Sequence, residues 1–428
     1  MQKKQVKKRY DSKGRILNIG EQERKDGRYM FSYKDDAGKP KYKYANTLPE
    51  LRNIEKDLNA KTVKGVRLSN NDKTIEYWAE KWEAYKKDTV RITTANGYHD
   101  VLYRHIVPDI GKNKIGNLTK NDVKSFYVRL FEKGLALGTV EIVHNVLCMI
   151  LSYAMDEHAI EKNCASGALK DFGYTKDQNE EVIAFTVEEE QHFLDFIAKT
   201  PKYKAWEPMI VFMLGTGCRI GETAGLIWED INFNKKTVTV SRNLNYKKKA
   251  DKCEFFFSRE SVVKQNASKR KDVITKTAAG KDRQIPLLDK VIEQLKIQKE
   301  MQMAKGVDKI DYQLEGFRNF VFTTKNALPQ KPNTLNRTLN NIIAECNKQE
   351  EMSAFMEDRE KVILPHVSVH NLRHTFCTRL CEHCQDLKFI MSVMGHENIN
   401  TTLKIYYHVQ EKNISDNFSK LQDGGFIL

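Results

Sequence analysis

The sequence lacks long apolar runs, an N-terminal segment of the secretory type, and any regular spacing among its eight cysteines. A membrane-spanning helix needs about 20 mostly apolar residues, and no run of that length is expected here. A secretion signal would begin with a basic stretch followed by an apolar one, which is missing. Scattered cysteines without such a signal are typical of a reducing compartment. We therefore expect a cytoplasmic protein with free thiols and no membrane-spanning segment.

Ligand spacings of the kind that bind zinc are missing as well. The stretch CEHC, Cys381–Cys384, is the one C-x-x-C motif. A zinc site would need a second pair of ligands at a suitable separation, and none is evident. We interpret these cysteines as ordinary helix residues and expect neither a metal nor a cofactor.

Acidic residues are too few to balance the basic ones. The formal net charge is +14, and residues 1–45 alone hold fourteen Lys and Arg against six acids, a net charge of +8. A second basic run lies between Tyr246 and Lys271. Such an excess indicates an anionic partner, either nucleic acid or an acidic membrane. The alternative is a soluble protein that is basic without a functional reason.

Three regions of different character follow one another along the chain. Residues 15–45 contain three short segments rich in Ile, Tyr and Phe (ILNIG, GRYMFSYKD and KPKYKYAN), and a helix is expected from Pro49. Residues 74–169 show helical periodicity throughout. The last region opens with a capping box at Thr186 and Glu189 and mixes helices with short strands.

We therefore predict a multidomain α+β protein. Residues 1–66 are predicted to form a small three-stranded sheet plus a helix, residues 72–170 an all-α domain, and residues 180–428 a mainly helical domain with a small antiparallel sheet. A basic sheet has either a solvated face or a face that enters a DNA groove. The local charge favours the second interpretation.

Two motifs in the last region carry basic residues next to turns. In TGCRIGE, residues 216–222, Arg219 lies two positions after Gly217, and Glu222 lies one helical turn later, where it could hold the guanidinium. In TKTAAGKDRQIPL, Lys276 precedes a predicted hairpin tip and Arg283 follows it. Taken alone, the first motif could be a surface ion pair and the second a solvated lysine.

Two further motifs carry histidines and tyrosines. In HNLRHTF, His370 and Arg373 share a helix face, beside an apolar stripe, near a helix start that favours anions. His374 points away from that face and is expected to pack or to form hydrogen bonds. In MGHENINTTLKIYYHV, His396 lies in a loop and a final helix carries Tyr406 and Tyr407. A tyrosine there is usually a core or interface residue.

Together these motifs, in this order, resemble the tyrosine recombinases of the lambda-integrase family. The stretch KGRILNIGEQERKDGRYMFSYK resembles the arm-binding domain of integrases from conjugative transposons. The resemblance covers nearly the whole chain. It implies an arm-site DNA-binding domain (1–66), a SAM-like core-binding domain (72–170) and a catalytic domain (180–428).

The resemblance also implies the site residues and the chemistry. The implied catalytic residues are Arg219, Lys276, His370, Arg373, His396 and Tyr406. Tyr406 is preferred to Tyr407 because the family often has the pattern Y-x-H-V, which YYHV satisfies with Tyr406 first. The arginines would hold the phosphate, the histidines would add hydrogen bonds and move a proton, Tyr406 would attack, and Lys276 would protonate the leaving 5′ oxygen.

The implied function is integration and excision of a mobile element through a 3′-phosphotyrosine intermediate, without metal or ATP. The implied partners are double-stranded DNA at core and arm sites, further copies of the chain in a tetramer, an excisionase and host DNA-bending proteins. The resemblance implies no membrane partner, and the implied location is the bacterial cytoplasm. Two alternatives remain at this point. One is a type IB-like DNA topoisomerase with the same chemistry, and the other is a non-catalytic DNA-bridging protein.

Overall fold

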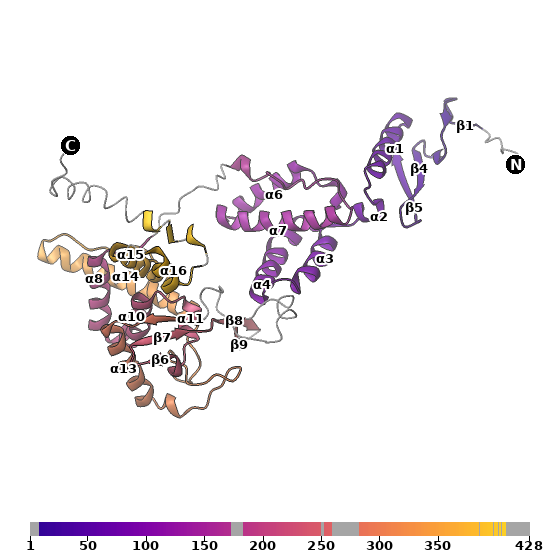
Figure 1. The fold of residues 1–428 in the computed structure, drawn as a ribbon. Helices are drawn as coiled ribbons and strands as arrows, with labels where there is room; N and C mark the ends of the chain where they lie inside the picture. The colour runs from indigo at the N-terminus through magenta and orange to yellow at the C-terminus, as the bar shows by residue number, and fades with distance from the viewer. Residues whose placement is uncertain are drawn as a thin grey trace, which may run out of the picture. The chain divides into compact units, whose positions relative to one another are not determined.

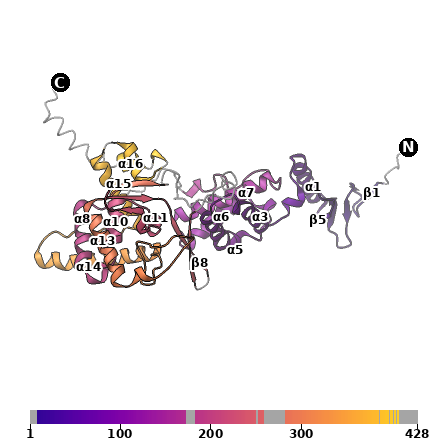
Figure 2. The same cartoon turned by 60° about the horizontal axis from the view of Figure 1, so that its bottom comes forward.

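The computed structural model describes residues 8–172, 183–249, 252–258, 282–384, 386–396, 398–400, 402–403 and 405–407. The chain forms two compact units that divide near residue 178 (Figures 1 and 2). The predicted fold class is confirmed, because small antiparallel sheets occur in both units and helices make up most of the rest. The Lys276 hairpin tip lies outside the described residues.

The first unit begins with a three-stranded antiparallel sheet in the order β3 (Glu21–Glu23), β4 (Tyr29–Lys34) and β5 (Pro40–Ala45). Helix α1 (Leu48–Val63) packs on β4 and β5 (Figure 1). Its cap is Thr47, which forms a capping box with Glu50. Because α1 covers one face of the sheet, Tyr42 and Tyr44 on the opposite face remain about half exposed.

The first strand of this sheet differs from the one expected. Ile16–Leu17 forms β2 and pairs with β1 (Arg9–Tyr10) in a separate ribbon, so ILNIG does not join the three-stranded sheet. Gly20, with φ of +92°, separates this ribbon from β3. A Cβ at Gly20 would lie 2.7 Å from the carbonyl oxygen of Ser32. The left-handed backbone and the close approach both require glycine there, and the strand restarts only after it.

Helices make up the rest of the first unit. The α-helices are α2 (Leu68–Asn71), α3 (Ile75–Lys87), α4 (Ile92–Val101), α5 (Val107–Ile110), α6 (Lys120–Glu132) and α7 (Leu137–Asp156). A π-helical turn at Leu102–Ile106 joins α4 to α5. Helices α3 and α6 are capped by Thr74 and Thr119. Both helices contribute to one hydrophobic core, in which Trp82 of α3 and Phe126 of α6 are almost completely buried.

Helix α7 corrects one expectation from the sequence. Its 20 residues are long and apolar enough to cross a membrane by length and composition alone, although no run of that kind was expected. In this unit, however, one side of α7 supplies buried residues such as Val143, Leu147 and Ile150 to the helical core. The apolar composition of α7 is therefore used in packing against α3, α4 and α6.

The second unit contains the mixed α and β region. Its longer helices are α8 (Val187–Lys199), α10 (Glu207–Thr216), α13 (Asp289–Ala304), α14 (Pro332–Glu357), α15 (Val369–His383) and α16 (Leu387–Met394), with short helices α9 (Pro201–Lys204) and α11 (Ile220–Ala224). A three-stranded antiparallel sheet has the order β10 (Arg283–Pro286), β7 (Thr237–Val240) and β6 (Ile231–Asn232). The predicted capping box of α8, Thr186 with Glu189, is confirmed.

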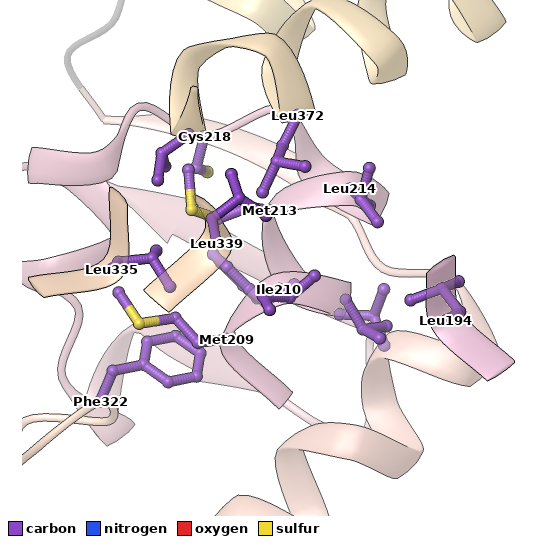
Figure 3. Packing of buried hydrophobic residues seen from close by; sticks show 14 of the residues in the cluster. Leu194, Met209, Ile210, Met213, Leu214, Cys218, Phe322, Leu335, Leu339 and Leu372 are labelled. Carbon is purple, nitrogen blue, oxygen red and sulfur yellow. The ribbon is translucent and has the colours of Figure 1, made fainter. Parts of the chain in front are cut away.

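Helix α10 lies at the centre of this unit and contacts α8, α13 and α15. Nearly all of its residues are buried, and Met209, Ile210 and Met213 pack with Leu335, Leu339 and Leu372 from α14 and α15 (Figure 3). Gly217, with φ of +61°, ends α10 in the left-handed conformation. A rigid buried helix therefore leads directly into the segment that carries Arg219.

The basic insertion after β7 contains a hairpin that the sequence pattern did not predict. Strands β8 (Leu244–Lys249) and β9 (Lys252–Phe257) pair in antiparallel register. Leu244, Phe255 and Phe257 are buried in a small cluster with Phe320. The hairpin is thereby anchored to the body of the second unit at its base.

Candidate active site

Arg219 lies at the turn between α10 and α11, as its position after a glycine predicts. It is the N-cap residue of α11, and its side chain is 15% exposed. Its Nη1 donates to Oε1 of Glu222 at 2.9 Å, and its backbone N–H donates to Oε2 of the same carboxylate at 2.9 Å. The predicted contact between Arg219 and Glu222 is therefore present. It is part of a buried group and not a surface ion pair.

Arg283 is a second arginine on the same carboxylate. It begins β10, and its Nη1 and Nη2 donate to Oε1 and Oε2 of Glu222 at 3.2 and 2.7 Å. Both side chains are almost fully buried. Burial alone would raise the pKa of Glu222, but the charges and hydrogen bonds of Arg283 and Arg219 outweigh it and hold that pKa below its usual range. Glu222 is therefore an anion that holds two guanidinium groups.

Arg373 comes from α15 and is 2% exposed. Its Nη1 donates to the carbonyl oxygen of Gly217 and its Nη2 to that of Met394, both at 2.5 Å. Burial and the nearby charge of Arg219 lower the pKa of Arg373 to about 10. The guanidinium thus stays protonated at neutral pH. Because charges act strongly in a desolvated site, it creates a strongly electropositive interior.

The C-terminal end of α16 brings these arginines together. Three successive carbonyl oxygens accept hydrogen bonds there: Val393 from Arg283 at 3.0 Å, Met394 from Arg373, and Gly395 from Arg219 at 3.1 Å. The last carbonyls of a helix have no partner within the helix and carry a partial negative charge. The helix end therefore orients three cations at one place.

His396 follows this helix end directly. Its Nδ1 is 2.9 Å from Oγ1 of Thr402, whose side chain is completely buried. Burial and the charges of Arg373 and Arg219 lower the pKa of His396 to about 3. The imidazole is therefore neutral at neutral pH. With Nδ1 bound to Thr402, the other ring nitrogen is the one that can exchange a proton or a hydrogen bond with a ligand.

His370 lies at the start of α15, where Ser368 and Asn371 form a capping box. It is exposed, and its ring makes an edge contact with the ring of His374 at 4.6 Å between centroids. His374 is half-buried, and burial together with the charge of Arg373 lowers its pKa. The expectation that His374 points away from His370 is therefore wrong, because its ring lies one helical turn further along α15 and packs on the ring of His370 beside the candidate site.

The two tyrosines differ in their surroundings. Tyr406 is partly buried and packs against a cluster formed by Cys377, Cys381, Ile390, Met394 and Ile405, whereas Tyr407 is 60% exposed. Met394 belongs both to this cluster and, through its carbonyl, to the partners of Arg373. Cys377 and Cys381 are residues of α15, as the sequence predicts. Lys276 lies outside the described residues.

Three of the six predicted residues, Arg219, Arg373 and His396, converge on the end of α16. His370 lies at the outer end of the same helix as Arg373, and Tyr406 packs on α15 and α16, which lie side by side (Figures 1 and 2). The position of Arg283 just after the predicted hairpin tip indicated no role for it. In RQIP, however, Arg283 occupies the same inward-facing phase as buried Ile285. A charge at an inward-facing strand position is a signal for a buried ion pair.

Three family models match three successive regions of the chain. The family model described as the phage integrase family matches residues 184–413, the DNA binding domain of tn916 integrase matches 5–62, and the phage integrase N-terminal SAM-like domain matches 74–131. The transposase from transposon Tn916 of Enterococcus faecalis is 25% identical over 418 residues, covering 94% of this chain and 93% of that protein. A XerC-like tyrosine recombinase from Caldanaerobacter subterraneus is 24% identical and covers 72% of each chain.

Solved structures agree at the level of the fold. The Tn1549 transposon integrase in complex with transposon right end DNA matches with a TM-score of 0.65 and 24% identity, covering 82% of this chain and 99% of that one. A lambda integrase dimer bound to a core site matches with a TM-score of 0.52 and 16% identity, covering 92% and 95%. Because the phage integrase model matches 230 of the 428 residues, the chain belongs to the phage integrase family, the tyrosine recombinases that cleave and rejoin DNA strands.

Proposed function

We propose that this recombinase integrates and excises a mobile genetic element of the conjugative-transposon type. It cleaves each DNA strand at a core site and conserves the energy of the phosphodiester bond in a 3′-phosphotyrosine. The observation that carries the chemical part of the proposal is the meeting of Arg219, Arg373 and His396 at the end of α16. The similarity to the transposases of Tn916 and Tn1545 over 94% of the chain supports the biological part.

Each proposed role follows from the chemistry of a phosphodiester. Its negative charge repels nucleophiles, and further charge develops on the equatorial oxygens as the attack proceeds. Two guanidinium groups, Arg219 and Arg373, provide fixed donors for those oxygens. His396 and His370 at the rim add hydrogen bonds and can accept the phenolic proton, because the charge of a bound phosphate offsets the arginine charges that lower the pKa of His396.

Tyr406 is the proposed nucleophile. Attack by its phenolic oxygen on phosphorus forms the 3′-phosphotyrosine bond and breaks the bond to the 5′ oxygen, which Lys276 protonates. A 5′ hydroxyl from a second duplex then attacks phosphorus and releases the tyrosine. Since the phosphotyrosine bond replaces the broken bond and conserves its energy, the cycle has no requirement for ATP. The arginines take the part that metal ions play in two-metal nucleases.

The proposed assembly uses the whole chain. Residues 1–66 bind arm sites, residues 72–170 bind the core site, residues 180–428 bind and cleave it, and four copies act together on two duplexes. The match of the first residues to the DNA binding domain of tn916 integrase supports the arm-site role. A lambda integrase tetramer bound to a Holliday junction, with a TM-score of 0.50, supports a tetramer. An excisionase and host DNA-bending proteins are proposed as further partners in the bacterial cytoplasm.

A nicked suicide substrate tests the chemistry. Cleavage near a nick releases a short 5′ oligonucleotide, so the covalent protein–DNA adduct accumulates and resists denaturation. Wild-type protein should form this adduct on its core site, Tyr406→Phe should form none, and Tyr407→Phe should behave like wild type. An adduct from Tyr406→Phe would assign the nucleophile to another residue, and no adduct from wild type would refute the proposed reaction.

A further inference from the structure

The contacts of Glu222 are divided unequally between its two arginines. Arg283 reaches both carboxylate oxygens, while the Arg219 side chain reaches Oε1 alone. The second terminal nitrogen of Arg219 instead donates to the carbonyl of Gly395. A carboxylate and a guanidinium prefer a two-bond, fork-to-fork pair. Arg283 occupies that arrangement and thereby keeps Arg219 out of it.

Arg283 also joins the sheet to the end of α16. Its Nε donates to the carbonyl of Val393 at 3.0 Å, one residue before the carbonyl that Arg373 binds. Because Arg283 is paired to Val240 in the register of β10 and β7, its backbone is held by the sheet. A single side chain therefore ties Glu222, the helix end and the His396 segment to a rigid element.

We propose that Arg283 is a positioning residue for DNA cleavage. It takes the two-bond place on Glu222, so that the guanidinium of Arg219 makes a single bond to Glu222 and keeps its other N–H groups for the phosphate. This inference rests on the proposed function, since it assigns Arg283 an effect on the phosphate through Arg219. Without Arg283, Arg219 turns into the two-bond pair with Glu222 and leaves the phosphate.

The test replaces Arg283 with lysine in the full-length protein. Lysine keeps the charge but is a point donor that cannot bind two carboxylate oxygens and a carbonyl in one plane. We expect adduct formation on the nicked substrate to slow by roughly 10- to 100-fold, the cost of misplacing a supporting group. Core-site affinity should stay within about twofold, because the overall DNA-binding charge is unchanged.

The matched control is Arg242→Lys. Arg242 is another buried arginine of this unit, bound through both terminal nitrogens to Asp230 at 2.6 and 3.0 Å, and it also contacts the carbonyl of Gly225 at the far end of α11. This change should lower thermal stability in the same way as Arg283→Lys but leave the cleavage rate as in wild type. Equal slowing by both variants would reduce Arg283 to a structural role and overturn the inference.

A double-mutant cycle with Arg219→Lys tests the route of the effect. The slow variants of this cycle are measured on a DNA substrate that has sulfur in place of the leaving 5′ oxygen. The sulfur leaves without needing a proton. If Arg283 acts through Arg219, the Arg283→Lys change should have little further effect once Arg219 is lysine. Undiminished slowing in that background, or a wild-type cleavage rate for Arg283→Lys alone, would overturn the inference. Absence of an adduct from wild type would instead refute the proposed function itself.

Discussion

Arg373 holds a positive charge at a position that is 2% exposed. Two carbonyl oxygens, from Gly217 and Met394, replace part of the water that it loses. Groups of this kind are oriented before a substrate arrives, so little rearrangement is needed when charge develops on a phosphate. The exposed fraction alone would suggest a structural residue. The convergence with Arg219 indicates a site that binds an anion.

Arg373→Lys should separate charge from geometry at this position. A lysine preserves the positive charge but cannot bind two carbonyls and a phosphate with one planar group. We expect the rate of adduct formation to fall by roughly 100- to 1,000-fold, as when a preorganised donor is lost. Single-turnover cleavage of the nicked substrate measures this rate. If the rate instead stays within about threefold of the wild-type rate, the positive charge alone suffices at this position and the prediction is wrong.

His396 should make the stability of the fold depend on pH. Its pKa is lowered to about 3 in the folded state, against about 6.5 for an unfolded histidine. Between these values the unfolded chain binds a proton that the folded chain rejects, so stability falls as pH decreases below about 6.5. Above that pH His396 is neutral in both states and contributes no pH dependence.

The measurement is the urea midpoint of unfolding between pH 7 and pH 5 for wild type and His396→Gln. The variant lacks this titration, so its midpoint should fall less steeply with decreasing pH than that of wild type. Three other histidines with lowered pKa remain in both proteins and cancel in the comparison: His105, His144 and His374. Parallel curves for the two proteins would contradict the burial of a neutral His396.

At the scale of single residues, the sequence identified pairs that are close along the chain. Arg219 and Glu222 are three positions apart, and helix geometry makes their contact predictable. Arg283 lies 61 positions from Glu222, and only the folded sheet brings the two together. The anchoring of Arg373 on a helix end was equally hidden, because its partners are backbone carbonyls, which every residue has.

At the scale of elements, two faces of helix α15 make different contacts. One carries Arg373. The other places Asn371, Thr375 and Arg379, four positions apart, against the backbone of residues 183–185. The Asn371 side chain donates to the carbonyl of Ile183, Oγ1 of Thr375 accepts from the backbone N–H of Phe185, and Arg379 donates to the carbonyl of Phe185. This segment leads into α8, so α15 holds the residues that directly precede α8.

Thr375→Val tests this contact without changing the shape of the side chain. Thr375 is 1% exposed, and valine would leave the buried N–H of Phe185 without its acceptor. An unsatisfied buried group costs about 1–3 kcal/mol, so the free energy of unfolding should decrease by that amount. Urea denaturation measures it. Thr378→Val, a half-buried threonine on the same helix, is the control and should change stability by less than about 0.5 kcal/mol.

Elements with local start and stop signals were predictable, and strand partners were less so. Asp386 caps α16 and Gly395 ends it, with φ of +63°, as the sequence indicates. The strand expected at ILNIG pairs with Arg9–Tyr10 instead, while Glu21–Glu23 joins the main sheet. Pairing depends on register between segments, and short strands carry little information about their partners.

At the scale of the whole molecule, the charge is concentrated in the first residues, which hold +8 of the net +14. The contacts between residues 1–65 and the following helices include exposed polar pairs. Lys64 binds Glu161 at 2.8 Å, Lys41 binds Asp72 at 3.2 Å, and Asp36 accepts from Ser69. Exposed pairs contribute between zero and about 1 kcal/mol each. The helices should therefore fold without the N-terminal sheet.

Deleting residues 1–65 should consequently separate two DNA-binding activities. The shortened protein keeps Val66, whose side chain is buried, and the hydrogen bond from the Arg67 backbone to the carbonyl of His158. Adduct formation on an isolated core site should stay within about threefold of wild type, since the residues proposed for cleavage all remain. Binding to arm-site DNA should be lost, because the deletion removes the basic residues proposed to contact its phosphates. The salt dependence of binding should also decrease by nearly one counterion for each phosphate contact removed. Footprinting of both sites at two salt concentrations measures this.

Equal loss at core and arm sites would show that the N-terminal sheet supports the catalytic part directly, and retained arm binding would place the arm-site surface elsewhere in the chain.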